Sequence, residues 1–186
     1  CFDQYGHLDV LVNNARGGQR TLPLKETEAN WQVAFDISLK APLFLGQKYV
    51  KLLKDTKRGG CILNISSVAA QSICHESASY HLSKSALENL TRYLAVHAGD
   101  KGIRVNGIRP GFIVQDEHQT RYWKDDNTSY RKTAEFCHPL KRIGSSGDVA
   151  DAALFLCSKQ ASFITGQILT VDGGLTIQDP WELTYR

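Results

Sequence analysis

A tyrosine and a lysine in this chain are spaced so that they could transfer a proton. Tyr80 and Lys84 lie four residues apart, and Ser67 precedes the tyrosine by thirteen residues. On a helix, residues i and i+4 share one face, so the ammonium of Lys84 can favour the ionised form of the Tyr80 phenol. An ordinary phenol, with a pKa of about 10, is a poor base at neutral pH. Because such pairs are also common on solvated helix faces, their surroundings must decide between the two interpretations.

The segments around these residues follow the pattern of an α/β domain. Short apolar runs that end in polar residues are typical of buried parallel strands. Apolar residues at helical spacing predict helices between them. This pattern predicts strands within residues 8–14, 61–66, 102–109 and 167–174, and helices within residues 28–54, 79–98 and 145–158. The alternation of strands and helices indicates one domain with a parallel sheet.

Three local features of these segments can be predicted. Pro42 lies inside the first long helix and should kink it, because proline has no backbone N–H to donate. Ser145 can cap the last helix, with Asp148 three residues further on. The polar stretch 114–139 contains several aromatic residues and is long for an ordinary connection. We expect it to be a mobile lid or substrate loop rather than a plain linker.

The composition fits one domain without a nucleic-acid surface. With 186 residues, 42% of them apolar, the chain can bury one sizeable core and is short for two domains. Its 22 basic and 19 acidic residues leave a net charge of +3. The basic residues are scattered, which indicates solvated helix faces rather than a nucleic-acid stripe. The exceptions are short groups such as Lys48, Lys51, Lys54, Lys57 and Arg58.

The cysteine pattern indicates a reducing compartment, and the hydropathy indicates a soluble protein. The five cysteines, at positions 1, 61, 74, 137 and 157, show no Cys-x-x-Cys spacing, and the six histidines show no metal-ligand pairing. We therefore expect neither disulfides nor a bound metal. No apolar run approaches the roughly 18 residues of a membrane span, and no signal-peptide pattern is present. We expect a soluble cytoplasmic protein with no membrane partner.

The order of the motifs resembles that of the short-chain dehydrogenase/reductase family, from Leu8 to Gly174. The likeness rests on Asn13-Asn14-Ala15, Ser67, Tyr80 with Lys84, Arg104-Val105-Asn106 leading to Pro110-Gly111, Thr165-Gly166-Gln167 and Asp172-Gly173-Gly174. The resemblance implies an α/β fold with a Rossmann-type, doubly wound parallel sheet. It also implies an oxidoreductase that uses NAD or NADP to interconvert a secondary alcohol and a ketone of a small molecule.

The resemblance further implies roles for individual side chains. Tyr80 would be the general acid in carbonyl reduction and the base in alcohol oxidation. Lys84 would bind the nicotinamide-ribose hydroxyls and assist the tyrosine. Ser67 would hydrogen-bond the substrate oxygen, with Ser66 the better candidate for capping the strand end. Ser38 aligns with the asparagine that is the fourth member of the family's catalytic set.

Cofactor contacts are implied at the ends of the strands and on the helix that carries the tyrosine. The segment after the first strand would line the cofactor near its ribose and tie neighbouring strands. The segment after the third strand would form a wall beside the nicotinamide. The implied cofactor-binding residues are Asn13, Asn14, Ala15, Ile65, Tyr80, Lys84, Pro110, Gly111 and Ile113. When complete, the protein would form a homodimer or homotetramer.

Three positions depart from the family pattern. Arg16 replaces the glycine that usually follows Asn-Asn-Ala, and it could contact a phosphate or point to solvent. Ile113-Val114-Gln115 stands where a threonine commonly bonds the nicotinamide carboxamide. At Ser38, the main-chain carbonyl could hold the water that relays protons from the lysine, because Pro42 has no N–H to pair with it.

The glycine-rich phosphate loop of such sheets is absent from the sequence. It normally follows strand 1, yet nothing like Gly-x-x-x-Gly-x-Gly precedes Leu8, so about seventy residues are missing by comparison with a whole member. The chain begins at Cys1 and contains no methionine. We interpret residues 1–186 as one partial dinucleotide-binding domain, truncated in its N-terminal half. The alternative is a truncated, non-catalytic relative that acts as a binding or assembly module. A serine hydrolase using Ser67 is disfavoured because no Gly-x-Ser-x-Gly elbow is present.

Overall fold

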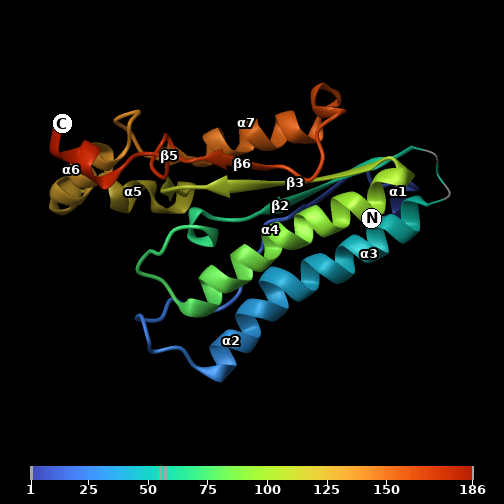
Figure 1. Cartoon of the computed structure of the whole chain (residues 1–186), viewed down its shortest axis with the longest axis horizontal. Helices are drawn as coiled ribbons and strands as arrows, with labels where there is room; N and C mark the ends of the chain where they lie inside the picture. Colours follow the sequence, from blue (N-terminus) through green and yellow to red (C-terminus); the bar gives the residue numbers. More distant parts are fainter. Residues whose placement is uncertain (1, 55, 57, 186) are drawn as a thin grey trace.

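Helices cover both faces of a parallel sheet in this protein (Figure 1). The computed structural model describes residues 2–54, 56 and 58–185. Cys1 and Lys57, which entered the arguments on cysteines and charge, lie outside the described residues. The strands are β1 (Val10–Asn13), β2 (Gly60–Ile65), β3 (Ile103–Pro110), β4 (Ile113–Val114), β5 (Gly144–Ser145) and β6 (Ile168–Val171). The α-helices are α1 (Phe2–Tyr5), α2 (Glu28–Phe35), α3 (Ala41–Leu53), α4 (Ala78–Ala98), α5 (Gln119–Tyr122), α6 (Thr128–Cys137) and α7 (Ser146–Cys157).

The main sheet has four parallel strands in the order β1-β2-β3-β6. All four predicted strands are present with shorter or slightly shifted bounds, and the predicted α/β fold with a parallel sheet is confirmed. Because the strands are parallel, their carboxyl ends lie along one edge, where ligands bind in folds of this type. The small parallel pair β4-β5 was not predicted, since each strand has only two residues and no readable period.

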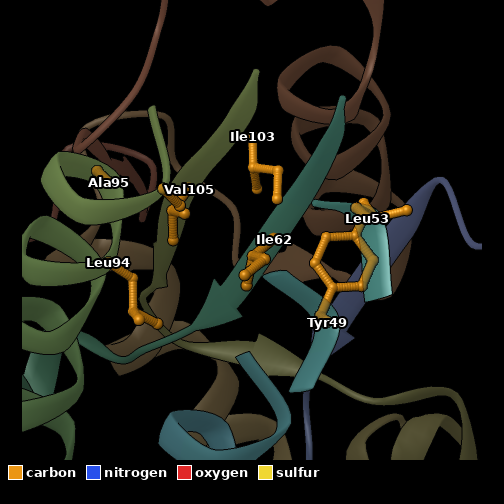
Figure 2. Close-up of a cluster of buried hydrophobic side chains, with 8 residues drawn as sticks. Tyr49, Leu53, Ile62, Leu94, Ala95, Ile103 and Val105 are labelled. Carbon is orange, nitrogen blue, oxygen red and sulfur yellow. The ribbon is translucent and has the colours of Figure 1, made fainter. Parts of the chain in front are cut away.

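The core lies in two layers, because neighbouring residues of a strand point to opposite faces. Ile62 packs on the side of α3 and α4, whereas Leu63 packs with Ile108 and Leu156 on the side of α7. Figure 2 shows the first layer, in which side chains of β2 and β3 meet those of α3 and α4: Ile62, Ile103, Val105, Tyr49, Leu53, Leu94 and Ala95. Burial on both faces explains why these strands read as continuous apolar runs.

The predicted irregularity of the first long helix is present, and it lies just before the proline. The helix is divided into α2 and α3 by a π-helical turn, Asp36–Lys40. There the N–H of Ala41 donates to the carbonyl of Asp36, five residues back. Pro42 falls in the first turn of α3, where a missing N–H is tolerated. The turn buries Ser38 against the loop that follows β1.

The predicted cap of the last helix is confirmed. The Ser145 side chain accepts a hydrogen bond from the N–H of Asp148, and the Asp148 carboxylate accepts one from the N–H of Ser145 at 2.7 Å. This capping box fixes the start of α7. The Arg142 guanidinium and these bonds from Ser145 hold the pKa of the Asp148 carboxyl well below its usual range.

The stretch 114–139 is mostly helical, and its helices were not predicted from the sequence. It contains α5, α6 and two short 3-10 turns. The helical signal is weak in sequence because α6 buries none of its residues completely. Instead, Arg131 holds the stretch together: its guanidinium lies over the Tyr122 and Trp123 rings, and its Nη1 donates to the carbonyls of Tyr122 and Lys124 at 2.7 Å and 2.6 Å. Whether the stretch acts as a lid stays a prediction.

The expectations on membranes, disulfides and metals concern features of the described residues only. Within that part of the chain, no helix is both long and apolar enough to cross a bilayer. The cysteines that the structure covers, Cys61, Cys74, Cys137 and Cys157, are free. No group of three or more His, Cys, Asp or Glu among residues 2–54, 56 and 58–185 could hold a metal ion.

A buried chain of polar side chains connects the edge strand to α4. Asn13 donates to the Asn64 side chain at 2.7 Å, and Asn64 donates to the Thr91 hydroxyl at 2.9 Å. Thr91 in turn donates to the carbonyl of Leu87 at 2.8 Å. Asn64 and Thr91 are fully buried, so each bond replaces one that water would otherwise supply. The chain therefore fixes α4, which carries Tyr80, against the sheet.

We predict that Thr91→Val lowers the free energy of unfolding by about 1–3 kcal/mol, because it leaves the buried Asn64 amide without an acceptor. The matched control is Thr133→Val, since Thr133 makes the same type of bond to the carbonyl of Ser129 on the exposed face of α6. Urea unfolding of both variants measures the difference. Equal losses of unfolding free energy in the two variants would show that the buried hydrogen bonds contribute no more to stability than an exposed one does.

Candidate active site

Tyr80 lies in the first turn of α4, near the carboxyl edge of the sheet. The cap of this helix is Ser77, whose hydroxyl accepts from the N–H of Tyr80 at 3.4 Å. The N–H of Ser79 donates to the Glu26 carboxylate at 2.8 Å, so a second free donor of the helix end is satisfied. Lys84 follows one turn later, with its Nζ 5.9 Å from the centre of the Tyr80 ring. The two side chains share one face of the helix, as their spacing predicts.

The Lys84 ammonium is buried and has little negative charge around it to compensate its own. Only 3% of the residue is exposed, and its Nζ donates to the carbonyl of Ile65, at the end of β2, over 2.7 Å. Among the described residues no carboxylate forms an ion pair with it. Burial lowers the pKa of Lys84 to about 8, and the positive charge of Arg16 contributes. The protein therefore holds a cation beside the Tyr80 ring at an energetic cost, which is common at functional sites.

The carboxylate nearest along this helix face is neutralised elsewhere. Glu88, one turn beyond Lys84, accepts from Arg109 Nε at 2.8 Å and from Arg109 Nη2 at 2.6 Å. Both residues are buried, and Ser66 also donates to Glu88 at 2.9 Å. Sequence reasoning missed this pair. A glutamate at i+4 from Lys84 on a buried helix face was the available signal.

Of the two serines at the end of β2, Ser67 rather than Ser66 forms the cap. Ser67 caps a 3-10 turn, Val68–Ala70, by accepting from the N–H of Ala69 at 3.2 Å. Ser66 instead points into the interior, toward Glu88. The expectation that Ser66 would be the cap was therefore wrong, because the buried carboxylate offers it a stronger acceptor. Ser67 uses an oxygen lone pair in its cap, so its hydroxyl proton stays available to another acceptor.

Among the described residues, the Ser38 side chain forms no hydrogen bond with Tyr80 or Lys84. Its hydroxyl accepts from the N–H of Gly17 at 3.3 Å, and 1% of the residue is exposed. Gly17 needs to be glycine, because a Cβ there would lie 2.5 Å from the carbonyl oxygen of Val33. Ser38 thus fixes the loop that follows β1 against the π-helical turn.

The expected cofactor-binding residues lie along the carboxyl edge of the sheet but differ in surroundings. Asn13 is buried and ties β1 to β2, as expected, whereas Asn14 and Ala15 are exposed at the start of the loop. Pro110 ends β3 beside Val171 of β6. The two expected cofactor-binding residues that follow β3, Gly111 and Ile113, are half-buried. The structure thus brings Ile65, Tyr80 and Lys84 together directly, and places the others at the ends of neighbouring strands.

Arg16 is partly exposed, with 34% of its side chain accessible, yet it is paired within the protein. Its guanidinium carbon lies 4.5 Å from the centre of the Tyr80 ring, and its Nη2 donates to the Glu76 carboxylate at 2.6 Å. Sequence reasoning missed Glu76, because the pair is sixty residues apart in the chain and no local period connects its members. Whether Arg16 also contacts a phosphate stays a prediction.

Comparison with known proteins agrees with this geometry. A family model described as Enoyl-(Acyl carrier protein) reductase matches residues 1–176. The 7alpha-hydroxysteroid dehydrogenase of Escherichia coli (strain K12) is 38% identical over 174 residues, which cover 94% of this chain and 66% of the relative. A solved structure described as ElxO with NADP bound has a TM-score of 0.85 and 30% identity, over 95% of this chain and 71% of that chain. A 7 alpha-hydroxysteroid dehydrogenase complexed with NADH and 7-oxo glycochenodeoxycholic acid has a TM-score of 0.80 and 37% identity, over 93% and 66% of the two chains.

These matches and the parallel sheet define the class of protein as a Rossmann-type α/β fold. The chain belongs to the short-chain dehydrogenase/reductase family. It spans about two thirds of the length of the relatives it matches, with 66% of the Escherichia coli enzyme covered. The roles expected of individual site residues are proposals, taken up below.

We predict that Lys84→Met raises stability at pH 7 and that the gain disappears as the pH rises from about 8 to about 10.5. The folded chain gives up the Lys84 proton near pH 8, whereas an ordinary lysine keeps its proton to 10.5. Between these values the unfolded state binds more protons, so the wild-type protein gains stability with rising pH. The pH-dependent part of the difference in unfolding free energy between Lys84→Met and the wild type should be about 3 kcal/mol at most.

Urea unfolding of the wild-type protein and the variant from pH 7 to pH 10.5 measures this difference. Lys132→Met, at an exposed position of α6, controls for loss of a surface charge. A stability difference that stays constant across the range would contradict the burial of a charged Lys84.

Proposed function

We propose that the protein is an NAD- or NADP-dependent oxidoreductase that interconverts a secondary alcohol and a ketone of a small molecule. The observation that carries this proposal is the buried Lys84 ammonium beside the Tyr80 phenol, at the carboxyl edge of a parallel sheet. The relatives support it, since one solved structure contains NADP and another contains NADH with an oxo-steroid acid.

The residues at this edge fit a nicotinamide dinucleotide. An ammonium has three donors, and the structure gives Lys84 Nζ one acceptor among the described residues, the carbonyl of Ile65. The remaining donors suit the ribose hydroxyls, and the positive charge of Lys84 suits an anionic cofactor. The other residues that would hold it are Asn13, Asn14, Ala15, Tyr80, Pro110, Gly111 and Ile113. When bound, the nicotinamide would supply or accept the hydride.

The side chains of this protein would handle the proton. In carbonyl reduction Tyr80 donates its phenolic proton to the substrate oxygen, and in alcohol oxidation it accepts that proton. The Lys84 ammonium stabilises the charge that develops on the phenol as the proton leaves. Ser67 donates its hydroxyl proton to the same substrate oxygen and so orients it toward Tyr80.

Ser38 would contribute through its backbone. Pro42 has no N–H, so it cannot pair with the carbonyl of Ser38 as a helical residue would. We propose that this carbonyl holds a water that relays protons from Lys84, with Pro42 maintaining the kink that the family's asparagine side chain usually supports. The Ser38 hydroxyl is engaged by Gly17, which leaves the carbonyl as the group for this role.

Substrate enclosure and assembly are further parts of the proposal. Residues 114–139 would cover the substrate, and the exposed rings of Trp123 and Tyr130 on this segment suit contact with an apolar molecule. Leu154 and Phe163, on α7 and shortly after it, are large exposed apolar side chains. Such side chains favour burial between copies, which supports a homodimer or homotetramer. We propose that this assembly works in the cytoplasm.

We predict that Tyr80→Phe in the full-length gene product lowers turnover by about a hundredfold to ten-thousandfold and leaves the cofactor Kd within about twofold. The substitution removes the transferable proton but keeps the ring and its packing. Tyr93→Phe is the control, since Tyr93 lies on the same helix with 56% of its surface exposed. Steady-state reduction of a panel of ketones gives the turnover, and titration by nicotinamide fluorescence gives the cofactor Kd.

Two results would count against the proposal. Turnover above a few per cent of wild type in Tyr80→Phe would exclude this tyrosine as the proton donor. Absence of any NAD- or NADP-dependent turnover by the wild-type gene product across the panel would favour the alternative, a non-catalytic binding or assembly module.

A further inference from the structure

Arg16, Glu76 and Tyr80 form a contact cluster, which we call the arginine clamp. The Arg16 guanidinium lies over the Tyr80 ring, 4.5 Å from its centre. Its Nη2 donates to Glu76 Oε2 at 2.6 Å. The clamp joins the loop after β1 to the loop before α4, so it links the two segments that flank the tyrosine.

The position of the Arg16 guanidinium is fixed through Glu76 on one side and through the backbone next to Arg16 on the other. Glu76 exposes 11% of its side chain and adjoins Ser77, the cap of α4, so its position is fixed relative to Tyr80. On the other side, Gly17 follows Arg16 directly, and its N–H is bound by the buried hydroxyl of Ser38. A partly buried ion pair between two anchored backbone segments is stronger than an exposed one.

The other charged groups around the tyrosine leave the clamp electropositive. Glu76 also pairs with Arg20 through its second oxygen, at 2.7 Å, so two cations neutralise one carboxylate. Glu26 is bound by the N–H of Ser79 at the start of α4. Lys84 adds a second cation 5.9 Å from the ring centre. Two positive side chains, those of Arg16 and Lys84, therefore lie 4.5 Å and 5.9 Å from the centre of the Tyr80 ring.

A cation over an aromatic face responds to the charge of the ring. The face of a neutral phenol is weakly negative and attracts a guanidinium. As Tyr80 gives up its proton, the ring becomes more negative and the attraction increases. An interaction that is stronger in the transition state than in the ground state accelerates the chemical step.

From this geometry we infer that Arg16 is a positioning residue for Tyr80, which fixes the ring and stabilises the charge that develops on it. The inference rests on the proposed function. It assigns a role to the residue that replaces the family's glycine, and it makes Glu76 the group that sets the orientation of Arg16.

The test compares two substitutions of Arg16 in the full-length gene product. Arg16→Gln removes the charge but keeps a donor for Glu76, and it should lower kcat for ketone reduction about tenfold while the cofactor Kd changes less than twofold. Arg16→Lys keeps a cation and should restore kcat to within about threefold of wild type. A merely structural role would not separate the lysine variant from the glutamine variant, or kcat from Kd.

Arg20→Gln is the matched control, because Arg20 pairs with the same carboxylate but 78% of its side chain is exposed. The cations found over the Tyr80 ring in the described part of the chain are Arg16 and Lys84. It should keep kcat within about twofold of wild type. Glu76→Gln releases the guanidinium without altering Arg16 and should lower kcat to a value between those of the two Arg16 variants. This variant keeps the inference testable if Arg16→Gln fails to fold.

Three outcomes would overturn the inference. Equal kcat losses for Arg16→Gln and Arg20→Gln would indicate a general charge effect. Unchanged kcat in Arg16→Gln would show that Tyr80 does not need the clamp. Tighter cofactor binding by Arg16→Gln would show that the arginine obstructs the cofactor site. In each case loss of turnover in Tyr80→Phe would leave the proposed function standing, whereas activity of Tyr80→Phe would reject the function itself.

Discussion

The buried ammonium of Lys84 is the constraint on which the site depends. Moving a charge out of water is unfavourable unless it is paired, and the structure gives this cation a carbonyl rather than a carboxylate. The fold can hold it because α4 is fixed to the sheet on both sides of the lysine. The Asn64–Thr91 bond anchors one part of the helix, and Ser77 and Glu26 satisfy its first turn. The result is a fixed positive charge beside Tyr80.

The Glu88–Arg109 pair explains why this charge stays uncompensated. Glu88 lies on the same helix face as Lys84 and would neutralise it if it were free. Arg109 engages both carboxylate oxygens and connects α4 to β3, while its Nη1 also donates to Thr170 of β6 at 3.1 Å. A bidentate, buried pair is specific in geometry. Removing one partner would therefore be expected to disturb the charge balance of the site as well as the packing.

Much of the fold could be predicted because its signals are local. Apolar runs such as 61–66 mark buried strands, and the spacing of Tyr80 and Lys84 places them on one face without knowledge of the tertiary structure. The contact of Arg16 with Glu76 could not be predicted, since it joins residues sixty positions apart whose loops meet only in the folded chain. The cap was expected at Ser66 rather than Ser67, because nothing local in the sequence shows that Glu88 gives Ser66 an interior partner. The helices within 114–139 were missed because they bury too few apolar residues to produce a period.

Titration of the Lys84 side chain tests most directly whether the fold holds a buried cation beside Tyr80. Lysine labelled with carbon-13 at Cε can be followed by NMR in the full-length gene product, with Lys84→Met assigning the resonance. Our account predicts a midpoint near pH 8, because burial and Arg16 both disfavour the charged form, and a higher midpoint in Arg16→Gln. A Lys84 midpoint near 10.5, the usual lysine value, would contradict the central claim that the fold holds a buried cation beside Tyr80.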